Sequence, residues 1–199
     1  MYGHMKIMMD AVKAGIEESG VAVEMYQVPE TLPDEVLEKM HAKGLKDASI
    51  PVITHDKYEV LEAADGLIVG SPTRFGMPAA QIKTFWDATG ALWMQGKLRG
   101  KTGGVVVSTA GQGGGQETTA LTHLTQFAHH GMIYIPQGIT AEMATDELRG
   151  GSAYGPGTFA NSDGSRLPSE LELKLAREYG ANFATTTHAL VTGRAALGK

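Results

Sequence analysis

The stretch Gly103-Gly-Val-Val-Val-Ser-Thr-Ala-Gly-Gln-Gly-Gly-Gly-Gln116 joins a β-branched run, a glycine-rich loop and the start of a helix. The run at 103–109 is typical of a buried strand. The glycines allow backbone amides to point toward a ligand. A helix is expected from Gln116 to His129. This order indicates a parallel sheet, which binds its ligands in loops where the strands end.

The same alternation of strands and helices extends through the rest of the chain. Its spacing predicts helices over 5–18, 33–43, 58–64, 78–90 and 169–190, and further strands over 21–28, 66–70 and 132–135. Such alternation predicts an α/β fold with helices on both faces of a parallel sheet. No linker divides the sequence, so 1–199 is expected to form a single domain. The segment 137–168 is too long for an ordinary connection and is expected to be functional or to form an interface.

The composition excludes several classes of function. The 199 residues include 42% hydrophobic and 20% charged residues, as in a globular protein, and 17 basic against 22 acidic residues give a net charge of −5. That balance argues against nucleic-acid binding. The lack of cysteine excludes disulfides and Cys-ligated metals, and no histidine spacing suggests zinc, so no metal is expected. No apolar run approaches the length of a membrane span, and a cytoplasmic protein is expected.

A second loop follows the strand at 66–70. In Ser71-Pro-Thr-Arg-Phe-Gly76 the proline fixes the turn, and the glycine allows close approach of the backbone to a ligand. Thr73 and Arg74 offer hydrogen-bond donors, and Phe75 could pack against a flat ring. The alternative is a plain turn between strand and helix with a solvated arginine.

The loop at 108–116 differs from the two best-known phosphate loops. No Lys-Ser/Thr pair follows its glycines, and it does not lie after the first strand as a dinucleotide fingerprint does. A flexible surface loop is the alternative. His129 could donate to a bound oxidant or simply interact with the end of its helix, whose inner face is assigned to Leu121, Leu124 and Ala128. His123 is expected on the surface of that helix. Trp93 could close over a ring, or it could pack at a subunit contact or in the core.

The sequence contains many groups suited to bind a ring or a phosphate and few suited to transfer protons. No Ser-His-Asp set is visible, and no pair of carboxylates suggests acid–base catalysis. No residue is therefore assigned as catalytic. This asymmetry favours a cofactor that carries out its own chemistry, as flavins do in hydride transfer.

Taken together, these motifs resemble the WrbA family of flavodoxin-like NAD(P)H:quinone oxidoreductases. The matching stretches span nearly the whole chain: Tyr2-Gly-His4, Ser71–Gly76, Gly90-Ala-Leu-Trp93, Gly113–Thr119, His129-His-Gly-Met132, Gly150–Gly155 and Gly164-Ser-Arg166. The resemblance implies a doubly wound, three-layer α/β/α sheet, FMN as cofactor, NADH or NADPH as donor, and a homodimer or homotetramer. It also implies a ping-pong reaction in which a quinone follows the donor into one pocket and takes two electrons.

The resemblance also implies roles for individual residues. The FMN phosphate loop would include Met1, Tyr2, Gly3, His4 and Met5, with Tyr2 also helping to hold the nicotinamide donor. The isoalloxazine ring would contact Thr73, Arg74, Phe75 and Gly76 of the loop that follows the strand at 66–70. The pyrimidine side of the ring and the ribityl chain would meet Ser108, Thr109, Ala110, Gly111, Gln112 and Gly113. His129 would lie near the ring, and Trp93 would line the quinone pocket.

This sequence departs from the family pattern at two places. Met77 stands where a small residue such as asparagine is usual, which puts one hydrogen bond at the ring edge in doubt. The apolar first strand of the family is also absent before Tyr2, so four strands are visible where five are expected. Because that strand is central in the flavodoxin order 2-1-3-4-5, a flavin-free scaffold form is an alternative. A flavodoxin-type electron carrier is the other.

Overall fold

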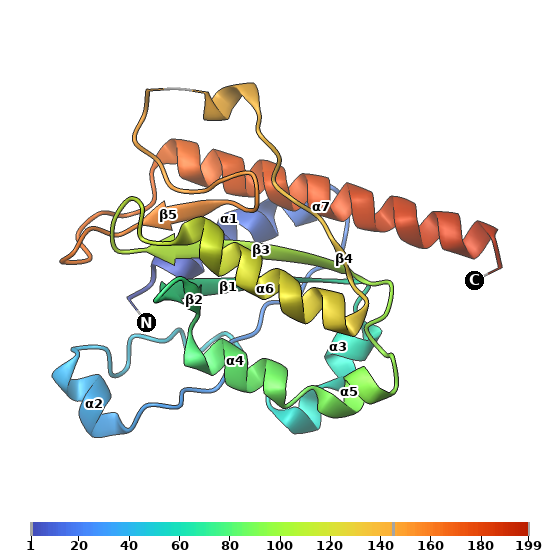
Figure 1. The fold of residues 1–199 in the computed structure, drawn as a ribbon, viewed down its shortest axis with the longest axis horizontal. Coiled ribbons are helices and arrows are strands. Elements are labelled where there is room, and N and C mark those ends of the chain that lie inside the picture. Colours follow the sequence, from blue (N-terminus) through green and yellow to red (C-terminus); the bar gives the residue numbers. More distant parts are fainter. Residues whose placement is uncertain (1, 145, 199) are drawn as a thin grey trace.

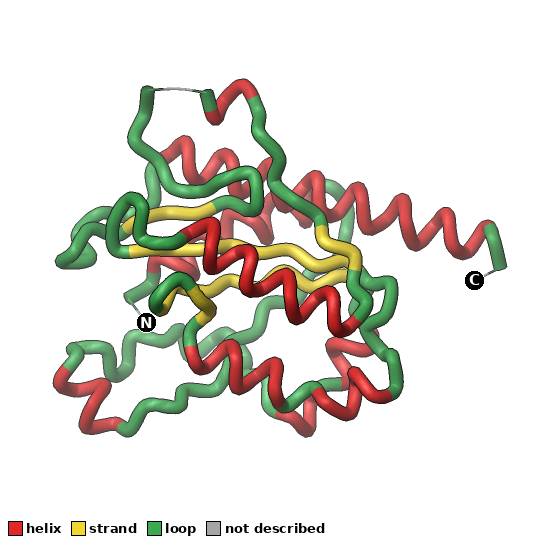
Figure 2. The backbone as a smooth tube through the Cα atoms, viewed as in Figure 1, coloured by secondary structure: helices red, strands yellow, loops and turns green. Residues whose placement is uncertain are grey.

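The computed structural model describes residues 2–144 and 146–198, in which parallel strands form the centre of the fold. The strands β1 (Gly66–Arg74), β3 (Thr102–Thr109), β4 (Ile133–Tyr134) and β5 (Gly157–Phe159) are parallel, and β2 (Met77–Pro78) folds back on the end of β1. The order is β2-β1-β3-β4, and β5 pairs with the carboxyl-terminal end of β3 (Figure 2). The longest ladder joins β1 to β3 from Gly66–Thr102 to Pro72–Ser108.

Helices cover both faces of this sheet, as expected (Figure 1). In Figure 1, α6 lies in front of the sheet, and α1 and α7 lie behind it. The helices are α1 (His4–Glu18), α2 (Asp34–Lys39), α3 (Glu59–Ala63), α4 (Ala80–Asp87), α5 (Gly90–Met94), α6 (Gln116–His130) and α7 (Glu170–Ala196), with 3₁₀ turns η1 (His55–Lys57) and η2 (Ala141–Met143). Two apolar layers result from this arrangement.

Strand β3 supplies side chains to both layers because neighbouring residues of a strand point to opposite faces. Val106 packs in the layer with α1 and α7, whereas Val105 and Val107 pack in the layer with α4 and α6. All eight residues of β3 are buried, which agrees with a strand covered on both sides. The β-branched run therefore predicts both the strand and its central place.

Two glycines allow α1 and α7 to cross at close range. A Cβ on Gly15 would overlap the carbonyl oxygen of Arg177, and a Cβ on Gly180 would overlap that of Val12. Both glycines are buried inside helices, where glycine costs about 1 kcal/mol relative to alanine. The close packing of α1 on α7 offsets that cost and sets the position of α1 along α7.

The expected strand over 21–28 is wrong. Its residues form no ladder, and only Gln27 bridges to Val52. In the order 2-1-3-4-5 this strand would pair with a first strand, and none precedes α1 among the described residues. Without a neighbouring strand among the described residues, the segment forms only the bonds of Gln27 with Pro51 and Ile53 and otherwise runs as an extended segment.

Other expected boundaries also shift. The helix expected over 33–43 ends at Lys39, because His41 adopts a left-handed backbone with φ of 51°, and no residue of α2 is buried. The helix expected over 78–90 divides into α4 and α5 near Thr89, whose hydroxyl bonds to the carbonyl of Trp86. The segment 137–168 contains η2 and β5, and the last helix extends to Ala196.

Candidate functional site

The end of β1 forms the first wall of the candidate site. Thr73 Oγ1 accepts a hydrogen bond from the amide of Gly76 at 3.2 Å and another from Thr119 Oγ1 at 2.8 Å. These two bonds tie the turn between β1 and β2 to the first turns of α6. Arg74 donates to the carbonyl of Thr73 at 2.7 Å. Pro72 does not fix this turn as expected, because β1 extends through Arg74 and Pro72 pairs with Ser108 inside the strand. The turn itself consists of Phe75 and Gly76.

Phe75 combines a strained backbone with a fully exposed ring. Its φ is 55°, in the left-handed region that a bulky side chain rarely adopts, and its relative exposure is 102%. Strain of this kind costs about 1–3 kcal/mol and is concentrated at functional sites. An aromatic ring held out in this way is available to contact a ligand.

The loop after β3 forms the second wall. Ser108 and Thr109 are the last residues of β3, and Ala110, Gly111 and Gln112 are exposed at its end. Thr109 Oγ1 donates to the carbonyl of Gly111 at 2.7 Å. A Cβ on Gly111 would meet nothing within 4 Å, so the loop faces open space.

This loop borders a cavity of about 470 Å³. Ala110, Gly111 and Gln112 form one side of it, and the other side consists of Leu148, Phe159, Asn161, Ser162 and Asp163. Asn161 is another residue with a left-handed backbone, at φ of 65°. The volume falls within the range of about 300–1,000 Å³ usual for cofactor sites.

The start of α1 lies at the same end of the sheet. Gly3 caps the helix in a left-handed conformation with φ of 90°, and no side chain in the described part of the chain caps the first amides of the helix. His4 is buried and donates through Nε2 to the carbonyl of Arg166 at 3.0 Å. Tyr2 is half exposed and bonds to Met40, and Met5 packs against Gly70. Met1 lies outside the described residues.

A buried ion pair that sequence reasoning missed holds these segments together. The Glu172 carboxylate is fully buried and pairs with Arg166 at 3.0 Å through both oxygens. It also accepts from Gly150 N at 2.6 Å and from Thr158 Oγ1 at 2.8 Å. The Ser169-Glu-Leu-Glu172 spacing, which forms a capping box at the start of α7, is the signal that could have found it.

Helix α5, which contains Trp93, and the last turn of α6, which contains His129, lie at the other end of the molecule from these loops (Figure 1). His129 is in the last turn of α6, whose 15 residues span about 22 Å from Gln116. Trp93 lies in α5, which the bond between Thr89 and His130 ties to that same end of α6. Within one chain the structure does not bring either residue to the loops at 73–76 and 108–113.

His123 is buried, which corrects the expected surface position. The buried face of α6 consists of Thr119, Ala120, His123, Phe127 and His130, whereas Leu121 and Ala128 are exposed. Neither ring nitrogen of His123 has a hydrogen-bond partner among the described residues. Burial alone lowers the pKa of His123 to about 4.

This histidine should make the stability of the protein fall in acid. Its unfolded pKa is about 6.5, so the unfolded state binds more protons than the folded state between about pH 6.5 and 4. The associated stability is complete above pH 6.5 and falls by about 3 kcal/mol by pH 4. His123→Leu is expected to remove this loss, as measured by urea unfolding at pH 7.5 and pH 5. His188→Gln, on the exposed side of α7, is the control, and an unchanged pH dependence in His123→Leu would contradict the prediction.

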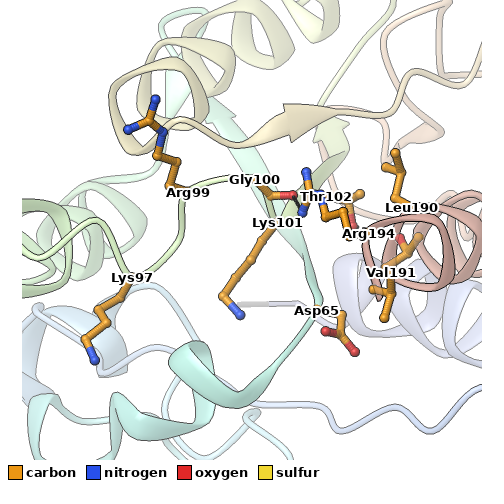
Figure 3. Close-up of a pocket in the computed structure, with 10 residues that line it drawn as sticks. Asp65, Lys97, Arg99, Gly100, Lys101, Thr102, Leu190, Val191 and Arg194 are labelled. Carbon is orange, nitrogen blue, oxygen red and sulfur yellow. Dashed lines mark hydrogen bonds between the residues drawn. The ribbon is translucent and has the colours of Figure 1, made fainter. Parts of the chain in front are cut away.

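A second cavity, of about 180 Å³, lies at the opposite end of the sheet (Figure 3). Lys97, Lys101 and Arg194 border it, but each already has a partner. Lys97 pairs with Glu62, Lys101 bonds to two carbonyls at the end of α3, and Arg194 donates to the carbonyl of Gly100 at 2.5 Å. Arg99 points away from the other cations in Figure 3. The cations therefore do not converge on one ligand.

Comparison with known proteins agrees with the geometry of the first site. The model of a family described as NADPH-dependent FMN reductase matches residues 3–146. The chain belongs to this family. The matched residues include the start of α1 and both glycine-containing loops of the candidate site.

Several curated relatives of this FMN reductase family member bear quinone reductase names. A quinone-oxidoreductase of Triphysaria versicolor is 53% identical over 190 residues, which cover 94% of this chain and 90% of that protein. An NAD(P)H dehydrogenase (quinone) of Aromatoleum aromaticum is 48% identical over 98% of this chain and 96% of that protein. An NAD(P)H quinone oxidoreductase of Candida albicans is 49% identical over 96% of this chain and 67% of that protein.

Solved structures confirm the flavodoxin-like fold class. A flavodoxin, WrbA-like protein from Agrobacterium tumefaciens matches with a TM-score of 0.62 and 23% identity over 94% of this chain and 92% of that one. A flavodoxin from the domain Archaea matches with a TM-score of 0.57. No helix in the described part of the chain is long and apolar enough to cross a membrane.

Proposed function

We propose that this chain is an FMN-dependent NAD(P)H:quinone oxidoreductase that reduces quinones to hydroquinones. One observation carries the proposal. The start of α1, the turn at 73–76 and the loop at 108–113 lie at one edge of the sheet, and residues 110–112 of that loop border a cavity of about 470 Å³. The quinone reductase names of relatives near 50% identity support the same activity.

The residues at this edge fit FMN. The free amides at the start of α1, with no acidic residue in the first turn, suit the phosphate. The exposed amides of 110–113 suit the polar edge of the ring, and Phe75 suits its flat face. A Cβ on Gly111 or Gly113 would meet no atom, so backbone can approach a ring there without obstruction. When bound, the flavin would supply the hydride chemistry.

The chain itself would bind and orient the reactants. Thr73, held by Thr119, would keep the turn at 73–76 beside the ring. The loop at 108–113 would exclude water from the opposite edge. NADH or NADPH and then the quinone would use the same pocket in turn.

The proposal includes a homodimer or homotetramer. If Trp93 and His129 serve the flavin site, a second copy must present them, because within one chain they lie near the far end of α6. Trp93 is 53% exposed and its neighbour Met94 is 81% exposed, as a subunit contact would require in a single chain. A cytoplasmic location belongs to the same proposal, since NAD(P)H is an intracellular donor.

Titration of the purified chain with FMN tests the proposal. Flavin absorbance is expected to become protein-bound, to bleach with NADH without oxygen, and to recover with benzoquinone. Bound flavin that NADH fails to bleach would favour an electron carrier, and a folded protein without flavin would favour a scaffold.

Riboflavin provides a test of the phosphate site. The anion at the amino end of α1 is expected to stabilise binding by about 1–2 kcal/mol, so FMN should bind roughly tenfold more tightly than riboflavin. Fluorescence titration of the two flavins measures the ratio. Equal dissociation constants would place the phosphate away from α1.

A further inference from the structure

Gln116 makes three hydrogen bonds to three different segments. Its Oε1 accepts from Gly151 N at 2.6 Å, and its Nε2 donates to Thr109 Oγ1 at 3.0 Å and to the carbonyl of Thr158 at 2.9 Å. Because the amide of Gly151 can only donate and the carbonyl of Thr158 can only accept, the orientation of the side-chain amide is determined. Both hydrogens of this side chain are used.

One of these bonds connects Gln116 to the loop at 108–113. Thr109 accepts from Gln116 and donates in turn to the carbonyl of Gly111. The loop beyond it is otherwise lightly held, since Gly114 N reaches the carbonyl of Gly111 at 3.3 Å and both Gly111 and Gly113 face open space. The backbone of Thr109 is held separately by Ala160 N at 2.9 Å. The bond from Gln116 therefore acts on the Thr109 side chain and, through it, on the carbonyl of Gly111.

The other two bonds lead to the residues joined to the Glu172 carboxylate. This group, here called the Glu172 frame, consists of Glu172, Arg166, Gly150 and Thr158. Gly151 follows Gly150, whose amide donates to Glu172, and the hydroxyl of Thr158 also donates to Glu172. The backbone carbonyl of Arg166, whose side chain is the ionic partner of Glu172, accepts a hydrogen bond from His4 Nε2 at the start of α1. The frame is buried and charge-paired, so it forms a firm anchor.

We propose that Gln116 is a positioning residue that holds the loop at 109–112 in its flavin-binding conformation by joining it to the Glu172 frame. The inference rests on the proposed function for its ligand. Gln116 acts through Thr109 and is not itself a contact of the flavin. Its loss should free the loop more than it affects the rest of the fold.

Gln116→Met tests this proposal because methionine has a similar length and forms none of the three bonds. We expect the dissociation constant for FMN to rise about tenfold. In the flavin-free protein, hydrogen exchange of the amides at 110–113 should become faster. Gln126→Met, on the same helix and outside this network, is the matched control and should change neither quantity.

Gln116→Glu separates the two ends of the connection. Its carboxylate still accepts from Gly151 N but cannot donate to Thr109 or to Thr158. Protection of the Gly151 amide should therefore remain, while exchange at 110–113 should rise as in the methionine variant. A purely structural role would affect both segments together.

The outcomes distinguish this inference from the proposed function. Wild-type affinity for FMN and unchanged loop exchange in Gln116→Met would overturn the role of Gln116. A wild-type protein that binds no FMN would instead contradict the proposed function. The exchange measurements need no flavin, so unchanged exchange at 110–113 would overturn the positioning role in that case as well.

Discussion

Gly180→Ala is expected to destabilise the protein by about 3 kcal/mol. The added methyl would overlap the carbonyl oxygen of Val12, and a backbone atom cannot turn aside as a flexible side chain can. Helix α1 would have to move away from α7, and His4 at its amino end would shift relative to Arg166. We therefore expect weaker FMN binding as well as a lower urea midpoint.

Gly193→Ala, on the same helix, is the matched control. A Cβ there would meet nothing within 4 Å, and alanine is favoured over glycine inside a helix by about 1 kcal/mol. This variant should be slightly more stable than the wild type. If Gly180→Ala also kept full stability, the close crossing of α1 and α7 would be refuted.

Glu172→Gln should have a comparably large effect, a loss of about 3 kcal/mol in the free energy of unfolding. The substitution keeps the volume but leaves the Arg166 guanidinium partly buried without its anion. The new amide group would also place a donor against the donors of Gly150, Ser169 or Arg166. Chemical denaturation measures the loss, and faster exchange at 150–159 should accompany it.

Glu170→Gln is the control for this prediction, because Glu170 is exposed in the same first turn of α7. Its change should stay within about 0.5 kcal/mol. Replacing both members of the pair by methionine is expected to recover part of the lost stability. A Glu172→Gln protein as stable as the wild type would show that the buried pair does not hold this frame.

The elements that were predicted correctly are those with strong local signals. The β-branched run before the glycines predicts β3, and the glycines predict the loop that borders the cavity. Gly76 correctly indicates a turn, whereas Pro72, expected in the same turn, lies within β1. In these places the conformation depends on backbone restrictions within a few residues, which the sequence shows directly.

The failures occur where burial depends on distant partners. His123 and Leu121 lie two positions apart on α6, and helical spacing alone did not reveal which of them faces the sheet. The strand expected over 21–28 has the right alternation but no neighbouring strand to pair with. Helical and strand periodicity indicate that a face exists, whereas the packing of other elements decides which face is covered.

The sequence by itself determined strands β1, β3 and β4, the helices between them and the glycine-containing loop after β3. The tertiary structure alone decided that α1 and α7 cross at Gly15 and Gly180 and that Glu172 is buried with Arg166. It also decided that Trp93 and His129 lie apart from the loops. Backbone preferences act within a few residues, but close packing and the pairing of buried charges require segments far apart in the sequence.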